Sequence, residues 1–276
     1  MYQEITYTVD DPVAIITMNR PQALHALTGR MMAEIRHALA AAENDPAVVG
    51  IVLTGAGRGF CAGADIAGLD ATASGDSGPA EDLSALKASP GDKAMGDNFQ
   101  VTYTYILSVT KPVIAAINGP CAGLGFCYAL LCDMRFAERQ AKFTTAFSQR
   151  GLIAEHASSW LLPRLIGPGK ALDLLWSARK FNGEEAYDLG VVERLVEQGE
   201  SVQAATNYIR ELAAVASPTS FKVIKAQVYR HLNMELGEAM KESNALMAES
   251  LVREDFKEGV RSFIEKRPPQ FKRLGS

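Results

Sequence analysis

One carboxylate in a mostly apolar segment is the first residue of this sequence that could do chemistry. The segment FSQRGLIAEHASSWLLPRL covers residues 147–165, and Glu155 is the only acid between Glu138 and Asp173. A carboxyl group among apolar side chains is a candidate general base. Two alternatives remain open: Glu155 could cap a helix that begins near His156, or His156 could itself be the base.

Two glycine-rich turns could bind a negatively charged oxygen. They are GAGRGFCAGAD, residues 55–65, and NGPCAGLGF, residues 118–126, and each follows a predicted buried strand. The first backbone N–H groups of a helix lack intrahelical acceptors, and the helix dipole favours negative charge there. The N–H groups of about Ala64 and Leu124 could therefore both donate to one carbonyl oxygen. The alternative is that the glycines only permit tight turns.

Other chemistry is less well supported by the residue patterns. Neither glycine turn matches the dinucleotide fingerprint GxGxxG or the phosphate-binding pattern GxxxxGK[ST]. The four cysteines form no CxxC pair or His/Cys cluster, so we expect reduced thiols and no metal site. One of them, Cys121 in GPCAG, formally fits a nucleophile elbow, which leaves a thiol hydrolase as an alternative.

Strands and helices alternate through the first two thirds of the chain and predict an α/β core. A helix is expected from an N-cap at Thr28 to the breaker Asn44-Asp45-Pro46. An apolar helix is expected to follow the second glycine turn. Strands are expected at residues 3–8, 13–18 and 113–117, in VVGIVLTGAG and near Met134, and a helical stretch at 99–109.

The last third of the chain is predicted to be helical. Amphipathic helices are expected at residues 202–215, 219–232 and 235–264. We therefore divide the chain into a core, residues 1–196, and a helical C-terminal region, residues 197–276. Its apolar stripe, which includes Phe221, Ile224 and Val228, predicts packing between subunits.

Composition limits the possible partners. The 276 residues are 47% hydrophobic and 22% charged, and the formal net charge is −4. This acidic balance disfavours nucleic acid and anionic membrane surfaces as partners. The sequence has no apolar run of about 18 residues and no secretory signal at its N-terminus, which favours a cytoplasmic location.

The segments NRPQALHALTGRM, GFCAGADI, NGPCAGLGF and CDMRFA, in that order, resemble the crotonase superfamily (enoyl-CoA hydratase/isomerase). The resemblance implies a spiral of ββα units, a C-terminal trimerisation region, and a homotrimer or a dimer of trimers. It implies acyl-CoA thioester substrates and no additional cofactor. It also implies that the thioester oxygen lies between the N–H groups of Ala64 and Leu124.

The same resemblance implies a substrate path. The backbone near Ala23, Leu24, Asp65 and Ile66 is expected to line the adenine and pantetheine positions. Ala62 and Phe147 are also expected to contact substrate. Family members often carry lysine where this chain has Gln22 and Ala67. Phe263 or Lys266 is expected to reach the coenzyme A pocket of a neighbouring subunit.

The family's two hydratase glutamates align with Cys127 and Phe147, neither of which is an acid. The segment that contains Glu155 resembles the peroxisomal type of Δ3,Δ2-enoyl-CoA isomerase, in which a glutamate at this place moves a proton. We therefore favour an isomerase with Glu155 as proton shuttle. The alternatives are an enoyl-CoA hydratase, a dehalogenase that uses Glu155 as nucleophile, and a non-catalytic acyl-CoA-binding protein.

Overall fold

Apolar, largely β-branched runs form a central sheet of six strands. The computed structural model describes all residues except 1, 66–67, 69, 71–73, 76–80 and 276. The strand order is β1-β2-β3-β4-β6-β9. β1 runs antiparallel to β2, and the other neighbouring pairs are parallel. The six strands are β1 (Ile5–Asp10), β2 (Val13–Met18), β3 (Gly50–Gly55), β4 (Val113–Ile117), β6 (Met134–Glu138) and β9 (Arg194–Val196).

Helices cover both faces of this sheet, so β3 and β4 are buried along their whole length. On one face, Leu53 of β3 shares a core cluster with Ile35 and with the rest of the apolar face of α1 (Gly29–Asn44). On the other face, Val52 packs with Ile209 of α8 (Ser201–Val215). Side chains alternate between the two faces of a strand, and neighbouring residues therefore belong to different clusters.

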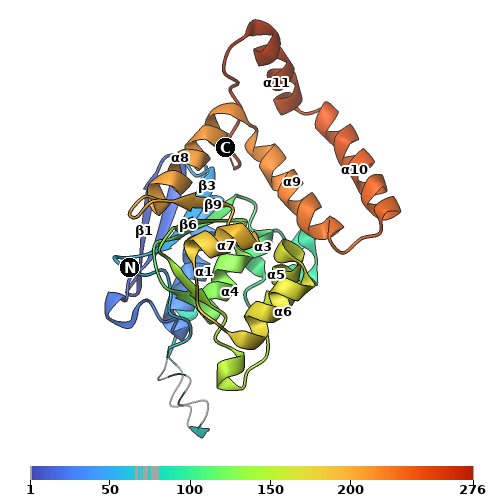
Figure 1. The fold of residues 1–276 in the computed structure, drawn as a ribbon. Helices are drawn as coiled ribbons and strands as arrows, with labels where there is room; N and C mark the ends of the chain where they lie inside the picture. Colours follow the sequence, from blue (N-terminus) through green and yellow to red (C-terminus); the bar gives the residue numbers. More distant parts are fainter. Residues whose placement is uncertain (1, 66–67, 69, 71–73, 76–80, 276) are drawn as a thin grey trace.

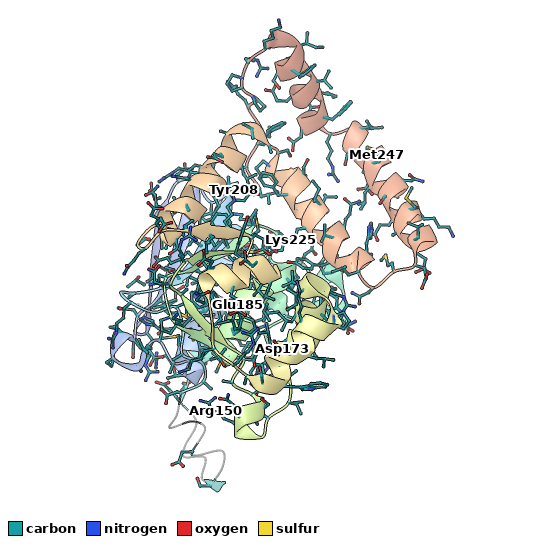
Figure 2. All side chains as sticks on the ribbon, viewed as in Figure 1. Arg150, Asp173, Glu185, Tyr208, Lys225 and Met247 are labelled. Carbon is teal, nitrogen blue, oxygen red and sulfur yellow. The ribbon has the colours of Figure 1, made fainter. Side chains whose placement is uncertain are left out.

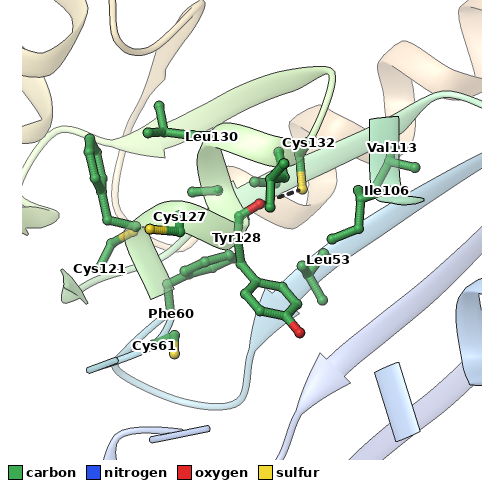
Figure 3. Packing of buried hydrophobic residues seen from close by; sticks show 14 of the residues in the cluster. Leu53, Phe60, Cys61, Ile106, Val113, Cys121, Cys127, Tyr128, Leu130 and Cys132 are labelled. Atoms are coloured by element: carbon green, nitrogen blue, oxygen red, sulfur yellow. Dashed lines mark hydrogen bonds between the residues drawn. The ribbon is translucent and has the colours of Figure 1, made fainter. Parts of the chain in front are cut away.

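A second, small sheet joins the glycine turns to the rest of the core. It contains three short strands in the order β5-β7-β8. They are β5 (Cys121–Ala122), β7 (Lys142–Thr144) and β8 (Phe181–Asn182). The core beside it is filled by aromatic side chains and thiols, including Phe60, Cys61 and Tyr128 (Figure 3). This packing fixes the backbone from which the turns project.

The remaining helices surround the sheets or extend from them. They are α3 (Tyr105–Ser108), α4 (Leu124–Leu131), α5 (Ser158–Ile166), α6 (Pro168–Ser177), α7 (Gly183–Leu189), α9 (Pro218–His231), α10 (Leu236–Leu251) and α11 (Glu254–Glu265). Short 3-10 turns occur at Pro21–Ala23, Ser84–Leu86, Lys93–Met95, Asp97–Phe99 and Ser148–Arg150. Among the helices of the described residues, none is both long and apolar enough to cross a membrane.

The helices after residue 196 differ in how they contact the core. α8 lies on the sheet, whereas α10 and α11 extend from the core as an arm, connected through α9 (Figure 1). On α9, Lys225 forms an ion pair with Asp133 at 2.7 Å, and the hydroxyl of Tyr229 donates to the same carboxylate at 3.0 Å. Figure 2 shows Lys225 close to the core and Met247 on the arm.

The structure confirms the α/β core and most of its predicted elements. α1 begins after Thr28, whose hydroxyl accepts the Met31 N–H as the N-cap pattern predicted. The strand at 113–117, the apolar helix after the second glycine turn and the strand at Met134 are also present. The first strand lies two residues later than predicted because the turn is confined to Asp11 and Pro12, so that Asp10 still pairs with Val13.

Two helix predictions were wrong in extent. The stretch 99–109 is α-helical only at Tyr105–Ser108, because Thr102 takes a left-handed backbone conformation with φ of 41°. A β-branched residue in that conformation interrupts a helix. The stretch 235–264 is two helices with a break at Val252 and Arg253. Two acids, Glu254 and Asp255, occupy the first turn of α11, which is a helix-start signal within the predicted continuous helix.

Candidate active site

The two glycine turns and the segment around Glu155 meet at one cavity of about 700 Å³. Mostly small residues line it, together with one aromatic, two leucines, one arginine and two acids. The lining residues are Ala23, Ala26, Ala62, Gly63, Ala64, Asp65, Gly123, Leu124, Ala146, Phe147, Arg150, Leu152 and Glu155. Segments from four separate parts of the chain therefore build a single pocket.

Backbone hydrogen bonds hold the two glycine turns against each other. Cys61 forms an isolated parallel bridge with Cys121, and the Ala122 N–H donates to the Cys61 carbonyl at 2.9 Å. A side chain on Gly63 would place its Cβ only 3.0 Å from the Ala122 oxygen and 3.6 Å from the nitrogen of Leu124. Gly63 also has a φ of +110°, so both space and conformation require glycine there.

This contact brings the two expected amide donors to the same wall. Leu124 is the first residue of α4, and its N–H therefore has no acceptor within the helix. Leu27 bonds to the residues on either side of Ala64: its N–H donates to Gly63 at 2.7 Å and its carbonyl accepts from Asp65 at 3.1 Å. The N–H of Ala64 must then point away from Leu27, because successive amides of an extended segment alternate in direction.

Glu155 is positioned by its main chain and not by its carboxylate. Its carbonyl accepts the Ser158 N–H at 2.9 Å and the Cys127 thiol at 3.5 Å. α5 begins at Ser158 and has no side-chain cap, so the helix-cap interpretation of Glu155 was wrong. The side chain is 27% exposed and lies in the cavity wall. Of the apolar residues in the segment 147–165, Phe147 is buried, whereas Ile153 points outward and is 82% exposed.

The other acid in the cavity wall is already paired. Asp65 forms an ion pair with Arg20 at 2.9 Å. At the two positions that the resemblance aligns with hydratase glutamates, Cys127 is fully buried and Phe147 lines the cavity. Arg150 is the one cation among the described residues of this wall, and one of its terminal nitrogens donates to the Ala146 carbonyl at 3.1 Å. Among the described lining residues, Glu155 is thus the carboxylate without an arginine partner.

The cysteines are poor nucleophiles in this fold. All four are buried and unbridged. Burial raises the pKa of the Cys121 thiol well above its usual value and also raises the pKa of Cys127, where the nearby Glu155 carboxylate adds to the effect. Cys121 is absent from the cavity wall, and this position argues against the thiol hydrolase alternative. In the described part of the chain, no group of three His, Cys, Asp or Glu residues could hold a metal ion.

Most of the expected site residues lie together. Ala23, Ala62, Ala64, Asp65, Leu124, Phe147 and Glu155 all line the cavity. Leu24 does not; its carbonyl accepts the Ala62 N–H at 2.9 Å, next to the wall. Ile66 lies outside the described residues. The sequence interpretation missed Ala26, Ala146 and Arg150, although Ala146 and Arg150 flank the predicted position of Phe147 closely enough to have been included.

Solved structures with this architecture identify the class of protein. An enoyl-CoA hydratase subunit from Geobacillus kaustophilus is 31% identical, with a TM-score of 0.83 over 100% of this chain and 99% of that one. An enoyl-CoA hydratase/isomerase family protein from Hyphomonas neptunium is 33% identical, with a TM-score of 0.83 over 98% and 97%. The spiral fold of the crotonase superfamily is thereby confirmed.

Sequence comparison places the chain within that class. The family model described as enoyl-CoA hydratase/isomerase matches residues 8–274. A crotonyl-CoA hydratase from Syntrophomonas wolfei is 32% identical over 98% of both chains. A 1,2-epoxyphenylacetyl-CoA isomerase from Escherichia coli is 32% identical over 98% of this chain and 99% of its own. The protein belongs to the enoyl-CoA hydratase/isomerase family and is an acyl-CoA-processing enzyme.

Proposed function

We propose that this enzyme is an enoyl-CoA isomerase that moves a double bond from C3 to C2 of an acyl-CoA thioester. The observation that carries the proposal is the carboxylate available in the described cavity wall. Glu155 has no lysine or arginine partner among the described residues, whereas Asp65 is paired with Arg20. Water addition is helped by two groups, one that activates water and one that protonates carbon. A double-bond shift needs only one base that receives and returns a proton.

In the proposed mechanism, the thioester oxygen accepts hydrogen bonds from the N–H groups of Ala64 and Leu124. Glu155 removes a proton from C2, and the electron pair of the C–H bond forms a dienolate whose negative oxygen is held by the two amides. The protonated Glu155 then returns the proton to C4. The C2–C3 double bond forms as the C3–C4 double bond is lost, and the carboxylate is restored. No oxidation state changes, so the proposed reaction requires no redox cofactor.

The remaining wall residues fit a long thioester substrate. We assign Ala23, Ala62, Asp65 and the expected residue Leu24 to the coenzyme A side of the path. Phe147 would contact the acyl group, because its apolar ring lines the same cavity as Glu155. The small side chains that line this path leave room for a pantetheine arm.

The first test compares two reactions of the wild-type enzyme. The rates of 3-enoyl-CoA isomerisation and 2-enoyl-CoA hydration are measured on substrates of the same chain length. Faster isomerisation supports the proposal. Hydratase activity is the second candidate, favoured by the similarity to crotonyl-CoA hydratase, and faster hydration would establish it instead.

The second test replaces the base. Glu155→Gln should lower kcat for isomerisation by about 10² to 10⁴-fold, as expected when a general base is lost. Affinity for acyl-CoA and the free energy of unfolding should change little, because Gln keeps the size of the side chain and the carboxylate makes no cap. Unchanged turnover in a folded variant would contradict the role of Glu155. Calorimetry with a saturated acyl-CoA checks binding separately.

A further inference from the structure

The side chain of His156 lies directly beside the proposed catalytic base. Its Nε2 atom is 3.8 Å from Oε2 of Glu155. This separation is longer than a hydrogen bond, although catalytic contacts often shorten when substrate binds. No hydrogen bond to the Glu155 carboxylate from another side chain is present among the described residues, and His156 is therefore the polar group best placed to orient it.

An aromatic side chain also contacts the His156 ring. The ring packs edge-on against Tyr103, with centroids 4.7 Å apart and an interplanar angle of 76°. Tyr103 is itself fixed, because it packs against Tyr128 and its hydroxyl contacts the sulfur of Met32 at 3.0 Å. The imidazole therefore lies near both the Tyr103 ring and the Glu155 carboxylate.

The backbone here is held in an unusual conformation. His156 and Ala157 are consecutive non-glycine residues with φ of 48° and 65°. Such conformations cost about 1–3 kcal/mol each and persist where the surroundings enforce them. The two main-chain contacts of Glu155, from Ser158 and Cys127, fix the turn on its N-terminal side. This turn sets the direction of the Glu155 and His156 side chains.

Among the described residues, the charged group beside the His156 ring is Glu155. Burial lowers the pKa of His156, and the Glu155 carboxylate only partly opposes this effect. The other groups nearby are the Tyr103 hydroxyl and the Cys127 thiol, whose pKa values are both raised, chiefly by burial. Near pH 7 both of these groups are neutral, and the imidazole is neutral too. A neutral imidazole still carries one N–H donor.

We propose that His156 is the positioning residue of Glu155. The inference depends on the proposed function. When substrate binds, the Nε2–H group donates to Oε2 of Glu155 and leaves Oε1 directed at the acyl chain. Oε1 then takes the proton from C2 and returns it to C4, so the same oxygen forms and breaks the O–H bond. His156 exchanges no proton in this cycle.

Two variants separate positioning from folding. His156→Asn suits the left-handed backbone, but its shorter amide does not reach Glu155. His156→Gln places an amide N–H close to the position of Nε2. We expect Asn to lower kcat roughly 10- to 100-fold, the effect of losing a hydrogen bond to a charged group, with KM nearly unchanged. Gln should restore most of kcat. Equal loss in both folded variants, or no loss in either, would overturn the proposal.

A double-mutant cycle with Glu155→Gln connects the two residues. If His156 acts through Glu155, His156→Asn should lower kcat no further when Glu155 is already Gln. Multiplicative losses would show that His156 acts independently and would refute positioning. The two proposals fail in different ways. Full activity of the Glu155→Gln variant would contradict the proposed function. Loss of activity in Glu155→Gln together with full activity in His156→Asn would contradict only the positioning role of His156. Thermal unfolding of each variant confirms that it folds.

Discussion

At the residue scale, the proposed oxyanion site depends on two backbone atoms and not on side-chain identity. Leu124 contributes the first N–H of α4, and Gly63 allows the neighbouring turn to approach within contact distance of it. Backbone donors are fixed before substrate arrives, and they need no reorganisation when charge develops on the thioester oxygen. Such a donor can be removed by substituting proline, which has no backbone N–H.

Replacing Leu124 by proline tests this donor. Proline is tolerated at the first position of a helix, where the missing N–H breaks no helical bond. We expect Leu124→Pro to reduce kcat by about 10² to 10³-fold. Leu124→Ala is the matched control, because it loses the same buried side chain but keeps the N–H; it should retain most of kcat. Similar kcat values for the two folded variants would argue against an oxyanion donor at this position.

At the element scale, one buried lysine joins α1 to the start of β4. The Nζ atom of Lys111 donates to the carbonyls of Ala42 at 2.9 Å and Asp45 at 2.6 Å. The side chain is almost completely buried, and burial lowers the pKa of Lys111 to about 8, with Asp45 and Glu43 opposing the shift. The contact closes the C-terminal end of α1, whose last carbonyls lack partners within the helix.

This pKa shift predicts a pH dependence of stability. Between about pH 8 and the usual lysine pKa near 10.5, the unfolded chain holds a proton on Lys111 that the folded chain has released. The contribution of Lys111 to the free energy of unfolding therefore rises with pH across this window. Lys111→Met removes that titration. Urea unfolding should show wild type gaining stability relative to the variant as pH rises through this window; parallel pH profiles would contradict the shift.

At the scale of the whole molecule, the C-terminal helices carry large apolar side chains that the single chain leaves exposed. Ile224 and Val228 on α9 are 55% and 54% exposed, and Phe263 on α11 is 86% exposed. Large exposed apolar surfaces mark interaction sites. These residues lie on the helices that connect or form the arm, away from the proposed active site (Figure 1). Their exposure favours packing between subunits, as the expected homotrimer or dimer of trimers requires.

The expected assembly predicts the molecular mass of the protein in solution and an effect of Phe263 on the KM for acyl-CoA. Light scattering at micromolar concentration should report a trimer or a hexamer, and a monomer would contradict the proposal. Phe263→Ala should leave the unfolding of the individual chain unchanged, since the ring is exposed within it. If the ring reaches a neighbouring coenzyme A pocket as expected, the variant should raise KM for acyl-CoA. An unchanged KM would exclude that contact.

The sequence by itself determined the elements whose signals are local. Periodicity located α1 and its Thr28 cap, and continuous apolar runs located β3 and β4, because burial on one or both faces is imposed residue by residue. The family resemblance and the two glycine turns indicated Ala64 and Leu124, and the isolated acid indicated Glu155. The break between α10 and α11 was missed because both helices are amphipathic and their stripes nearly continue across it.

Only the tertiary structure decided how these elements meet. Sequence left open whether Glu155 caps a helix. In the structure, a left-handed turn at His156 and Ala157 precedes α5, and α5 has no side-chain cap. The structure also shows that Asp65 is paired with Arg20 and that His156 lies beside Glu155. No local sequence pattern encodes these contacts between side chains. The physical reason is that backbone conformation is set largely by neighbours in sequence, whereas the charge and orientation of a site depend on residues brought together by packing.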